Sequence, residues 1–477
     1  MSSRSTISRR PFALRACAAA VVLGLGLAGA VPAHAENLMD VYRQALQSDP
    51  VLKQAEAQKR IGQAGEAQSR ALLLPQINGQ VSLNDNHGTS GSSALVDTPT
   101  GPEFVTGVSH DSGRSRTESV GLQQVLFDLG KFSQLRASKA NAAASAAQLI
   151  AARQNLILRV AQAYFTVLTD EDQLKYAKSN AASLKKQLDQ TQAKYDVGFA
   201  PITDVADAKA QYDSATAEVI SAENIVFNDR QALEQITGQK TGTLEVLTDK
   251  VPLSPPQPND IKNWVTTALA SNPSLQAQRD NVEAAGHNVT TARAARLPTL
   301  DASVNYSHNP SWGADAIDPS IMPSNTTNVL RGDEFHNTTT LGVILSVPLF
   351  AGGGTAAQIR SSIAQRDQAR DVLEQDRRTT VSNTRNAFNA IAAGISSVEA
   401  EKAAVTSANE ALKATQAGYD IGTQNITQVL IAQSTYFQAL SAYSQARHAL
   451  VINRLNLEFA AGTLSVNDLQ AVNALLQ

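Results

Sequence analysis

The stretch "YDVGFAPITD" occupies residues 195–204, and a near-copy, "YDIGTQNITQ", occupies residues 419–428. Each lies between two long segments whose apolar residues recur at alternating steps of three and four, the spacing of a helix face. The glycine in each stretch permits the left-handed backbone of a tight turn. The two stretches therefore predict two helical hairpins of one design, at equivalent places in two halves of the chain.

The repetition extends well beyond these turns. "ALQSDP" at 45–50 recurs as "ALASNP" at 268–273, and Leu126-Phe127 recurs as Leu349-Phe350. The offset between the copies changes by a single residue over the whole repeat, which indicates an internal duplication. The period is too long for a solenoid unit, so we expect each half to be a complete structural module.

Each module is expected to contain a helix, a β-hairpin and a long helical hairpin. The first module covers residues 36–250, with a helix at about 38–73, a β-hairpin at 76–127 and a helical hairpin at 129–238. The second covers residues 261–465, with the same elements at about 261–296, 299–350 and 354–460. A proline-rich linker at 251–260 separates them, with a short strand expected at 243–247, and residues 466–477 form a C-terminal tail.

The strands are predicted from alternation of apolar and polar residues. Ile77, Val81 and Leu83 alternate with polar residues in the first half, and residues 300–306 do so in the second. Segments of roughly nine to eleven residues with one apolar face suit a membrane β-barrel. They suit a half-buried sheet in a soluble domain equally well. The polar segments at 85–115 and 308–337 are expected to be exposed loops.

The helices give the strongest pattern. Neither proline nor glycine occurs between Lys131 and Asp196, and a helix over this length reaches about 100 Å at ~1.5 Å per residue. Small and apolar residues line one face of the following helix, which indicates a closely packed coiled coil interrupted only by Asp229. A helix of this length is expected to span a distance that no globular domain requires.

Composition and the remaining motifs narrow the function. Residues 1–35 resemble a secretory signal peptide, with Arg9 and Arg10 before an apolar run and Ala33-His34-Ala35 as a cleavage site. The leader carries four arginines and no acid, so the net charge of −3 for the chain becomes −7 without it. An acidic chain without a basic cluster gives no reason to expect a nucleic acid. No enzyme motif, metal-ligand spacing or cofactor loop is present, so we expect no enzyme, metal or cofactor.

Several short motifs occur at matching places in this arrangement: "ITDV", "AQYD", "LEQITG", "SVPLF", "AGYDIGT" and "GTLSVNDL". With them, the mature chain resembles the TolC family of outer-membrane efflux proteins. The resemblance implies a mixed α and β membrane protein, a homotrimer whose four strands per chain form one twelve-stranded β-barrel in outer-membrane lipid. A long α-helical coiled-coil tunnel would cross the periplasm, with an equatorial belt that includes the linker and the C-terminal tail.

The same resemblance implies a passive duct located in the cell outer membrane, with most of its mass in the periplasm. It would conduct substrate in a tripartite efflux or type I secretion system. Its partners would be a periplasmic membrane-fusion adaptor and an inner-membrane transporter, either ABC-type or proton-driven. A periplasmic coiled-coil adaptor or scaffold is the alternative, because it would share the export signal and the coiled coils.

By resemblance, the two turns are the hairpin tips at the periplasmic entrance, and their adaptor-docking positions are Val197, Gly198, Ile421 and Gly422. Each glycine is equally explained as a turn residue. The positions that match the family's gate are Thr203, Asp204 and Tyr419, with Asp207 one turn later. Gln424 stands where the family has an arginine, while Gln428 and Ile431 stand at two acidic positions. We expect Asp204, linked to Gln424 and Gln428, to hold the entrance closed; a simple helix-start acid is the alternative for Asp204.

Overall fold

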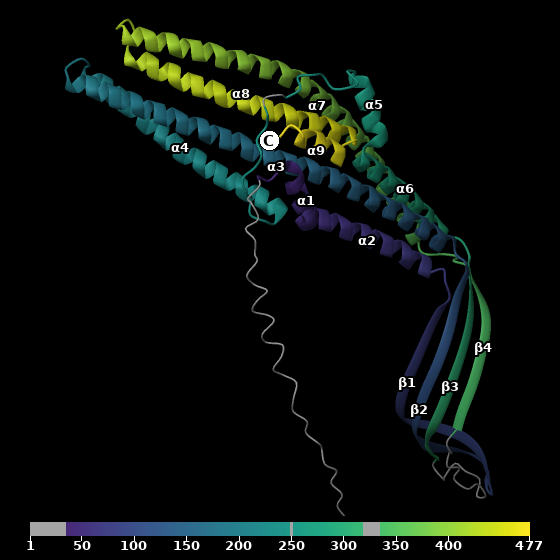
Figure 1. The fold of residues 1–477 in the computed structure, drawn as a ribbon. Helices are drawn as coiled ribbons and strands as arrows, with labels where there is room; N and C mark the ends of the chain where they lie inside the picture. The colour runs from purple at the N-terminus through teal and green to yellow at the C-terminus, as the bar shows by residue number, and fades with distance from the viewer. Residues whose placement is uncertain (1–34, 249–250, 318–333) are drawn as a thin grey trace, which may run out of the picture.

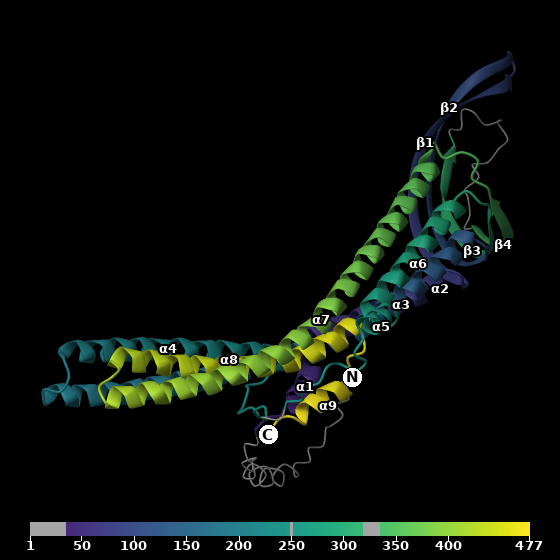
Figure 2. The same ribbon diagram turned by 90° about the horizontal axis from the view of Figure 1, so that it is seen from above.

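The computed structural model describes residues 35–248, 251–317 and 334–477 (Figure 1). The predicted signal peptide lies, apart from Ala35, outside these residues. A four-stranded sheet forms one end of the molecule, and two helical hairpins project toward the other (Figures 1 and 2). The elements of the first half are α1 Leu38–Ser48, α2 Pro50–Ala71, β1 Gln76–Thr98, β2 Gly101–Phe127, α3 Leu129–Asp196 and α4 Ile202–Thr237. Those of the second half are α5 Ile261–Ser271, α6 Pro273–Ala294, β3 Thr299–Ile317, β4 Glu334–Ser346, α7 Gly354–Asp420, α8 Ile426–Ala461 and α9 Val466–Asn473.

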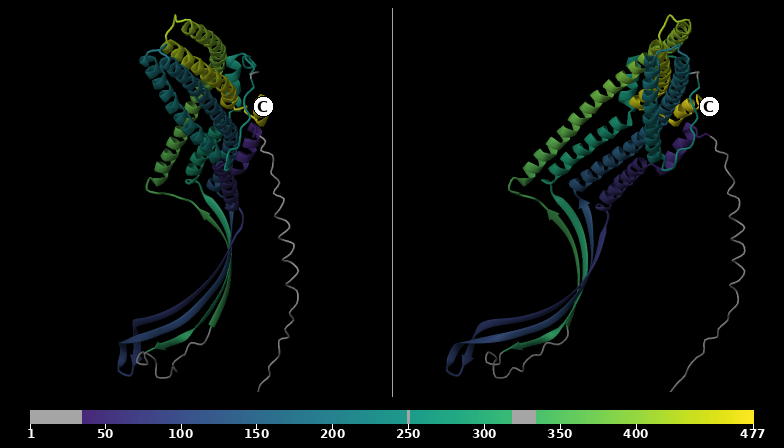
Figure 3. Two further views of the ribbon diagram at one scale, coloured as in Figure 1. Left: turned by 60° about the vertical axis from the view of Figure 1, so that its left-hand side comes forward. Right: turned by 90° about the vertical axis from the view of Figure 1, so that its left-hand side faces the viewer.

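Four helices continue from the sheet in an open layer. Helices α2, α3, α6 and α7 lie side by side in that order and continue from strands β1 to β4, above the sheet in Figure 3. Beyond the middle of the molecule, α4 pairs with α3 and α8 pairs with α7, so the long helices α3 and α7 extend through both regions. None of the helices in the described ranges is long and apolar enough to cross a membrane.

The helix that precedes each β-hairpin is broken, contrary to the single helix expected at 38–73 and at 261–296. Asp49 and Asn272 separate α1 from α2 and α5 from α6. Each is followed by proline, which disfavours the helical conformation in the residue before it. Each also caps the new helix with its side chain: Asp49 accepts a hydrogen bond from the Leu52 amide at 2.8 Å, and Asn272 from the Ser274 amide at 3.0 Å.

The strands are longer than expected, and the predicted loop at 85–115 is wrong. Strands β1 and β2 remain paired from Gln76 and Gln123 out to Thr98 and Gly101. Cross-strand contacts sustain this polar ribbon, including the ion pair of Asp85 with Arg114 at 3.1 Å. Much of the predicted loop at 308–337 is also strand, because β3 runs to Ile317 and β4 begins at Glu334; residues 318–333 lie outside the described part.

Near the helices, the sheet has one apolar and one polar face. The pairing places Ile77, Leu122, Val304 and Leu341 in one row across all four strands. The adjacent row, on the opposite face, is Asn78, Gly121, Asn305 and Thr340. Ile77 is 70% exposed and Leu341 is 80% exposed, so the apolar face is uncovered. The described strands are ordered β1-β2-β3-β4, which leaves β1 and β4 each with one unpaired edge.

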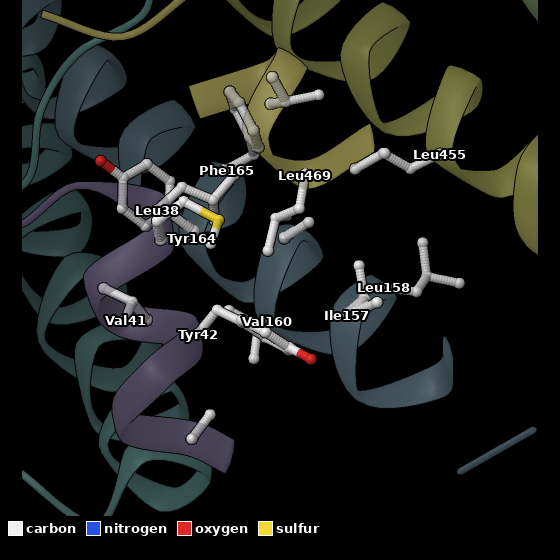
Figure 4. Packing of buried hydrophobic residues seen from close by; sticks show 14 of the residues in the cluster. Leu38, Val41, Tyr42, Ile157, Leu158, Val160, Tyr164, Phe165, Leu455 and Leu469 are labelled. Atoms are coloured by element: carbon white, nitrogen blue, oxygen red, sulfur yellow. The ribbon is translucent and has the colours of Figure 1, made fainter. Parts of the chain in front are cut away.

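The largest apolar core surrounds the middle of α3. Leu156 is fully buried there, as are Val160 and Tyr164, which lie beneath α1 and α9 in Figure 4. The Tyr164 hydroxyl donates to the carbonyl oxygens of Glu36, at 3.1 Å, and Glu245, at 2.8 Å. The short strand expected at 243–247 is reduced to two isolated bridges, Glu36 with Leu244 and Leu247 with Leu476. Segments from three distant parts of the chain therefore meet on α3.

The proline-rich linker packs on α8 and α5 through its carbonyl groups. Arg454 of α8 donates to the carbonyl oxygens of Pro252, at 2.6 Å, and Ser254, at 2.8 Å. The Trp264 indole of α5 donates to the Pro258 carbonyl at 2.8 Å. Prolines cannot donate backbone hydrogen bonds, so the linker is attached through its acceptors.

Gly462, the C-cap of α8, should tolerate no side chain. Its φ is +75°, and an added Cβ would lie 2.5 Å from the Asn272 Cα. Gly462→Ala should cost about 2 kcal/mol or more, because backbone must move and the left-handed conformation is strained. Thermal unfolding of the purified protein measures this loss. Gly286→Ala is the matched control within α6, where an added Cβ meets nothing within 4 Å, and it should be neutral or stabilise by up to ~1 kcal/mol. Equal midpoints for the two variants would contradict the packing at Gly462.

Candidate functional site

The two hairpin tips are built alike. Gly198 follows α3 with a φ of +82°, and Gly422 follows α7 with a φ of +80°. The Gly198 amide donates to the Tyr195 carbonyl at 2.9 Å, and the Gly422 amide donates to the Tyr419 carbonyl at 3.1 Å. A Cβ on either glycine would meet no atom within 4 Å. Backbone conformation, rather than crowding, therefore explains glycine at both tips.

The helices that leave the tips begin differently. In the second hairpin, the Asn425 side chain caps α8 by accepting from the Gln428 amide at 2.9 Å. In the first hairpin, Pro201 occupies the N-cap of α4 and provides no side-chain cap. Asp204 lies in the first turn of α4, where a carboxylate interacts favourably with the helix dipole.

A small apolar layer joins the two hairpins near their tips. Its buried residues come from α3, α4 and α8: Leu184, Ala208, Ala215, Ile426, Val429 and Leu430. Tyr419 is partly buried against this layer, which places one predicted entrance residue in the contact between the hairpins.

Two polar contacts bridge the hairpins at the rim of this layer. The Thr427 hydroxyl of α8 donates to the Asp207 carboxylate of α4 at 3.1 Å. The Lys194 ammonium of α3 lies 4.2 Å from the centre of the Tyr419 ring of α7, a cation–π arrangement. Of the predicted entrance residues, Asp207 and Tyr419 therefore each contact a residue of the opposite hairpin.

The other predicted entrance residues do not make the expected links within the chain. Among the described residues, no side-chain bond joins Asp204 to Gln424 or Gln428. Gln424 packs over Gly418 instead: a Cβ added to Gly418 would lie only 2.7 Å from the Gln424 Cγ. Thr203, Gln428 and Ile431 are exposed.

Lys194 and Thr427 were not anticipated from the sequence. Each contacts a residue more than two hundred positions away in the sequence, on a helix of the other hairpin. The apolar pattern of the helices does not define how these helices are rotated relative to one another. The available signal was local: Lys194 immediately precedes Tyr195, and Thr427 immediately precedes Gln428 in the second tip. Neither position stands out from the exposed polar residues of a helix end.

The outermost residues of both tips are apolar and exposed. Val197 and Ile421 occupy equivalent positions after the last turns of α3 and α7, and they are 67% and 77% exposed. Phe199 is 85% exposed and Ile202 is also exposed. No group of three or more potential metal ligands occurs within the described ranges. The tips therefore expose apolar side chains beside uncrowded glycines.

Comparison with known proteins identifies the family. The profile of the outer membrane efflux protein family matches residues 41–239 and 264–463, one match in each half of the duplication. The chain belongs to this family. Outer membrane protein TolC of Vibrio cholerae is 34% identical over 442 residues, which cover 92% of this chain and 94% of that protein. Alkaline protease secretion protein AprF of Pseudomonas aeruginosa is 29% identical, with coverages of 93% and 88%.

A solved structure supports the fold. The outer membrane channel CmeC of Campylobacter jejuni superposes with a TM-score of 0.69 at 20% identity, covering 93% of this chain and 90% of that one. The chain is thus an outer-membrane efflux channel protein with a large helical periplasmic part, and the family is one of channels rather than enzymes. The adaptor or scaffold alternative is not supported, since family matches cover both halves.

Proposed function

We propose that three copies of this chain assemble into one passive channel. Their sheets would close into a twelve-stranded barrel, and their long helices would form the wall of a tunnel across the periplasm. The observation that carries this proposal is the open sheet, with unpaired edges on β1 and β4 and an exposed apolar face. Backbone groups at a sheet edge in lipid require partners, and joining edge to edge in a ring satisfies all of them.

The helical layer has the same open design. Helices α2 and α7 lie at its two sides, so β1 next to β4 of a second copy would bring α2 next to α7 of that copy. The proposed channel would form no covalent bond with its cargo and would carry out no enzyme chemistry. Drugs, metals or secreted proteins would be delivered into it by a separate inner-membrane transporter.

The domains are assigned accordingly. Residues 1–35 would direct export and be removed, and modules 36–250 and 261–465 would each supply two strands and one helical hairpin. The linker 251–260 and the tail 466–477 would form the equatorial belt. The packing of α9 and of residues 244–247 around the middle of α3 supports the assignment of the tail.

The proposed assembly has a direct test. Native mass spectrometry of the full chain in detergent should give a homotrimer, and planar bilayers containing it should show channel conductance. Leu341→Asp, on the apolar face of β4, should reduce the recovered trimer, because a charged side chain on the lipid-facing side of a strand is destabilising. Thr340→Asp on the opposite face is the matched control and should assemble. A stable monomer that partitions away from detergent would contradict the proposal.

The partners would meet the channel at its tips. We infer that Val197 and Gly198, with Ile421 and Gly422, contact a periplasmic membrane-fusion adaptor, which links the channel to an inner-membrane ABC or proton-driven transporter. The exposed apolar side chains and uncrowded glycines support this inference, because they allow close approach of a second helical hairpin.

Adaptor docking predicts the effect of a charge at the tips. Val197→Asp combined with Ile421→Asp should weaken binding of the adaptor on the order of 100-fold, since an unpaired carboxylate at an apolar contact costs about 3 kcal/mol. Binding of the purified adaptor to the purified channel measures this. Ile220→Asp, at an exposed position on α4 away from the tips, should bind normally. Normal binding by the double variant would exclude the tips as the docking surface.

The entrance would be held closed by the polar residues around the tips. The proposed set is Thr203, Asp204, Asp207, Tyr419, Gln424, Gln428 and Ile431. Contacts of Tyr419 with Lys194 and of Asp207 with Thr427 support a role in joining the hairpins. Asp204 has no side-chain partner within the described part of its own chain, so its proposed partner is a second copy. Amide groups from Gln424 and Gln428 of that copy would face it.

The entrance proposal is tested by conductance. Asp204→Ala and Tyr419→Leu should each shift the balance from closed to open by about five-fold, equivalent to about 1 kcal/mol for one lost hydrogen bond or cation–π contact. Single-channel recording in planar bilayers measures the open fraction. Asp213→Ala, an exposed position further along α4, is the control and should behave as the wild type. An unchanged open fraction in both entrance variants would sink the proposal.

A further inference from the structure

A polar cavity of about 630 Å³ lies where the end of α8 meets the start of α6 and the middle of α7. Amide and hydroxyl side chains form much of its wall. Five of these side chains are asparagines: Asn272, Asn383, Asn386, Asn453 and Asn456. Asp376 is the one ionisable side chain among the described residues that line the cavity. The cavity therefore presents neutral hydrogen-bonding groups to whatever enters it.

In the first half of the duplication, an ion pair occupies the equivalent place. Arg159 of α3 donates through Nη1 and Nη2 to the Asp49 carboxylate at 3.3 and 2.7 Å, and Asp49 is 2% exposed. Arg159 and Asn383 lie equally far before the two hairpin tips, and Asn272 is the counterpart of Asp49. Two asparagine side chains are too short to bridge the gap that an arginine crosses. The second half therefore retains a cavity between elements that the ion pair joins in the first half.

Three of the five asparagines have amide groups available for a ligand. Within the described ranges, the side chains of Asn383, Asn386 and Asn456 bond to no other residue. The other two, Asn272 and Asn453, donate to backbone carbonyl oxygens at 3.2 and 3.4 Å. An asparagine amide carries two donor hydrogens and one acceptor oxygen. The cavity wall can therefore both donate to and accept from one bound molecule.

The cavity lies on the face of α8 that is turned away from the linker and the core around α3. Arg454 bonds the linker, and Leu455 is buried in that core. Successive helical residues are rotated by about 100°, so Asn453 and Asn456 project from the opposite face of α8. In the proposed channel the linker belongs to the outer belt, so this face borders the lumen. The inference that follows rests on that proposed function.

The chemistry of the wall favours one class of ligand, an extended polypeptide. A polypeptide backbone offers N–H donors and C=O acceptors in regular alternation, and each of them requires a partner. Neutral amides can bond these groups whatever the charge of the side chains between them. Leu275 and Phe459 add apolar surface to the lining, against which aliphatic side chains can pack. A phosphate or nucleotide would require cationic groups, which the described lining residues do not include.

We propose that this asparagine-lined cavity is a binding site for an extended polypeptide on the wall of the lumen. The amides of Asn383 and Asn386 on α7 and of Asn456 on α8 hydrogen-bond the backbone of a segment in transit. Because each such bond contributes only about 1 kcal/mol net, the segment is held briefly and released. The site gives the channel a polypeptide as its cargo, and it recognises that cargo by its backbone rather than by its sequence.

Peptide binding to the purified full chain in detergent tests the site. The probe is a fluorescent, end-capped peptide of about twenty alternating glycines and serines, which is uncharged and behaves as a flexible coil. Fluorescence anisotropy measures its dissociation constant. Oligoproline of the same length has no backbone N–H groups, so it should bind at least about ten-fold more weakly than the glycine–serine peptide.

Substitutions in the wall should remove the binding. Asn383→Leu combined with Asn386→Leu should weaken peptide binding about 30-fold, the loss expected for two hydrogen bonds. Asn389→Leu is the matched control on α7: Asn389 is exposed and does not line the cavity, so this variant should bind as the wild type does.

A second variant copies the first half of the chain into the second. Asn272→Asp combined with Asn383→Arg should fill the cavity with the ion pair that Asp49 and Arg159 form, and it should also weaken peptide binding about ten-fold or more. This variant should remain folded, because an aspartate at the equivalent position already caps α2. Thermal unfolding of both double variants checks that their folds are intact.

Two results would overturn the proposal. One is a wild-type protein that does not bind the glycine–serine peptide, or folded double variants that bind it as well as the wild type. The other is maltohexaose that displaces the peptide and loses its own binding in the leucine variant, which would make the cavity a sugar site. Binding in detergent requires neither a trimer nor conductance. Peptide binding with the expected losses but without a trimer would thus contradict the channel alone, and a conducting trimer that binds no peptide would contradict the site alone.

Discussion

The rest of the structure depends on the packing around the middle of α3. A helix of 68 residues has no stable position by itself, since most helical stability in proteins comes from tertiary contacts. Here its central residues are buried beneath α1, α9 and residues 244–247, and Tyr164 hydrogen-bonds Glu36, just before α1, and Glu245. The sheet at one end and the hairpin tips at the other extend from this fixed centre.

Much of this fold follows from sequence periodicity, because long helices and amphipathic strands leave regular patterns. The duplication and the two helical hairpins have such patterns. The break at Asp49 and Pro50 also had a local signal, an acid before a proline, but the helical pattern continues on both sides and hides it. The polar ribbon of β1 and β2 has no comparable sequence signal. Its two strands are held together by backbone hydrogen bonds and by pairs such as Asp85 with Arg114, which composition does not reveal.

At the tips, too, features that depend on neighbouring residues were predictable, and contacts between distant parts of the chain were not. Gly198 and Gly422 were identifiable because a left-handed turn restricts the choice of residue. The contacts of Lys194 with Tyr419 and of Thr427 with Asp207 depend on how one hairpin is rotated against the other. That rotation is determined by the small apolar layer between them. The close packing of Gln424 against Gly418 depends likewise on how the chain folds back at the tip.

The unpaired edges of β1 and β4 have a consequence for the life of the chain before it reaches its destination. Exposed edge strands bind other strands with little selectivity, and an uncovered apolar face promotes aggregation. For a newly exported copy, pairing with the correct partners therefore competes with misassembly, and dilution favours neither of these two reactions. If the proposed assembly forms, its yield would therefore depend on assembly kinetics as well as on the stability of the helices.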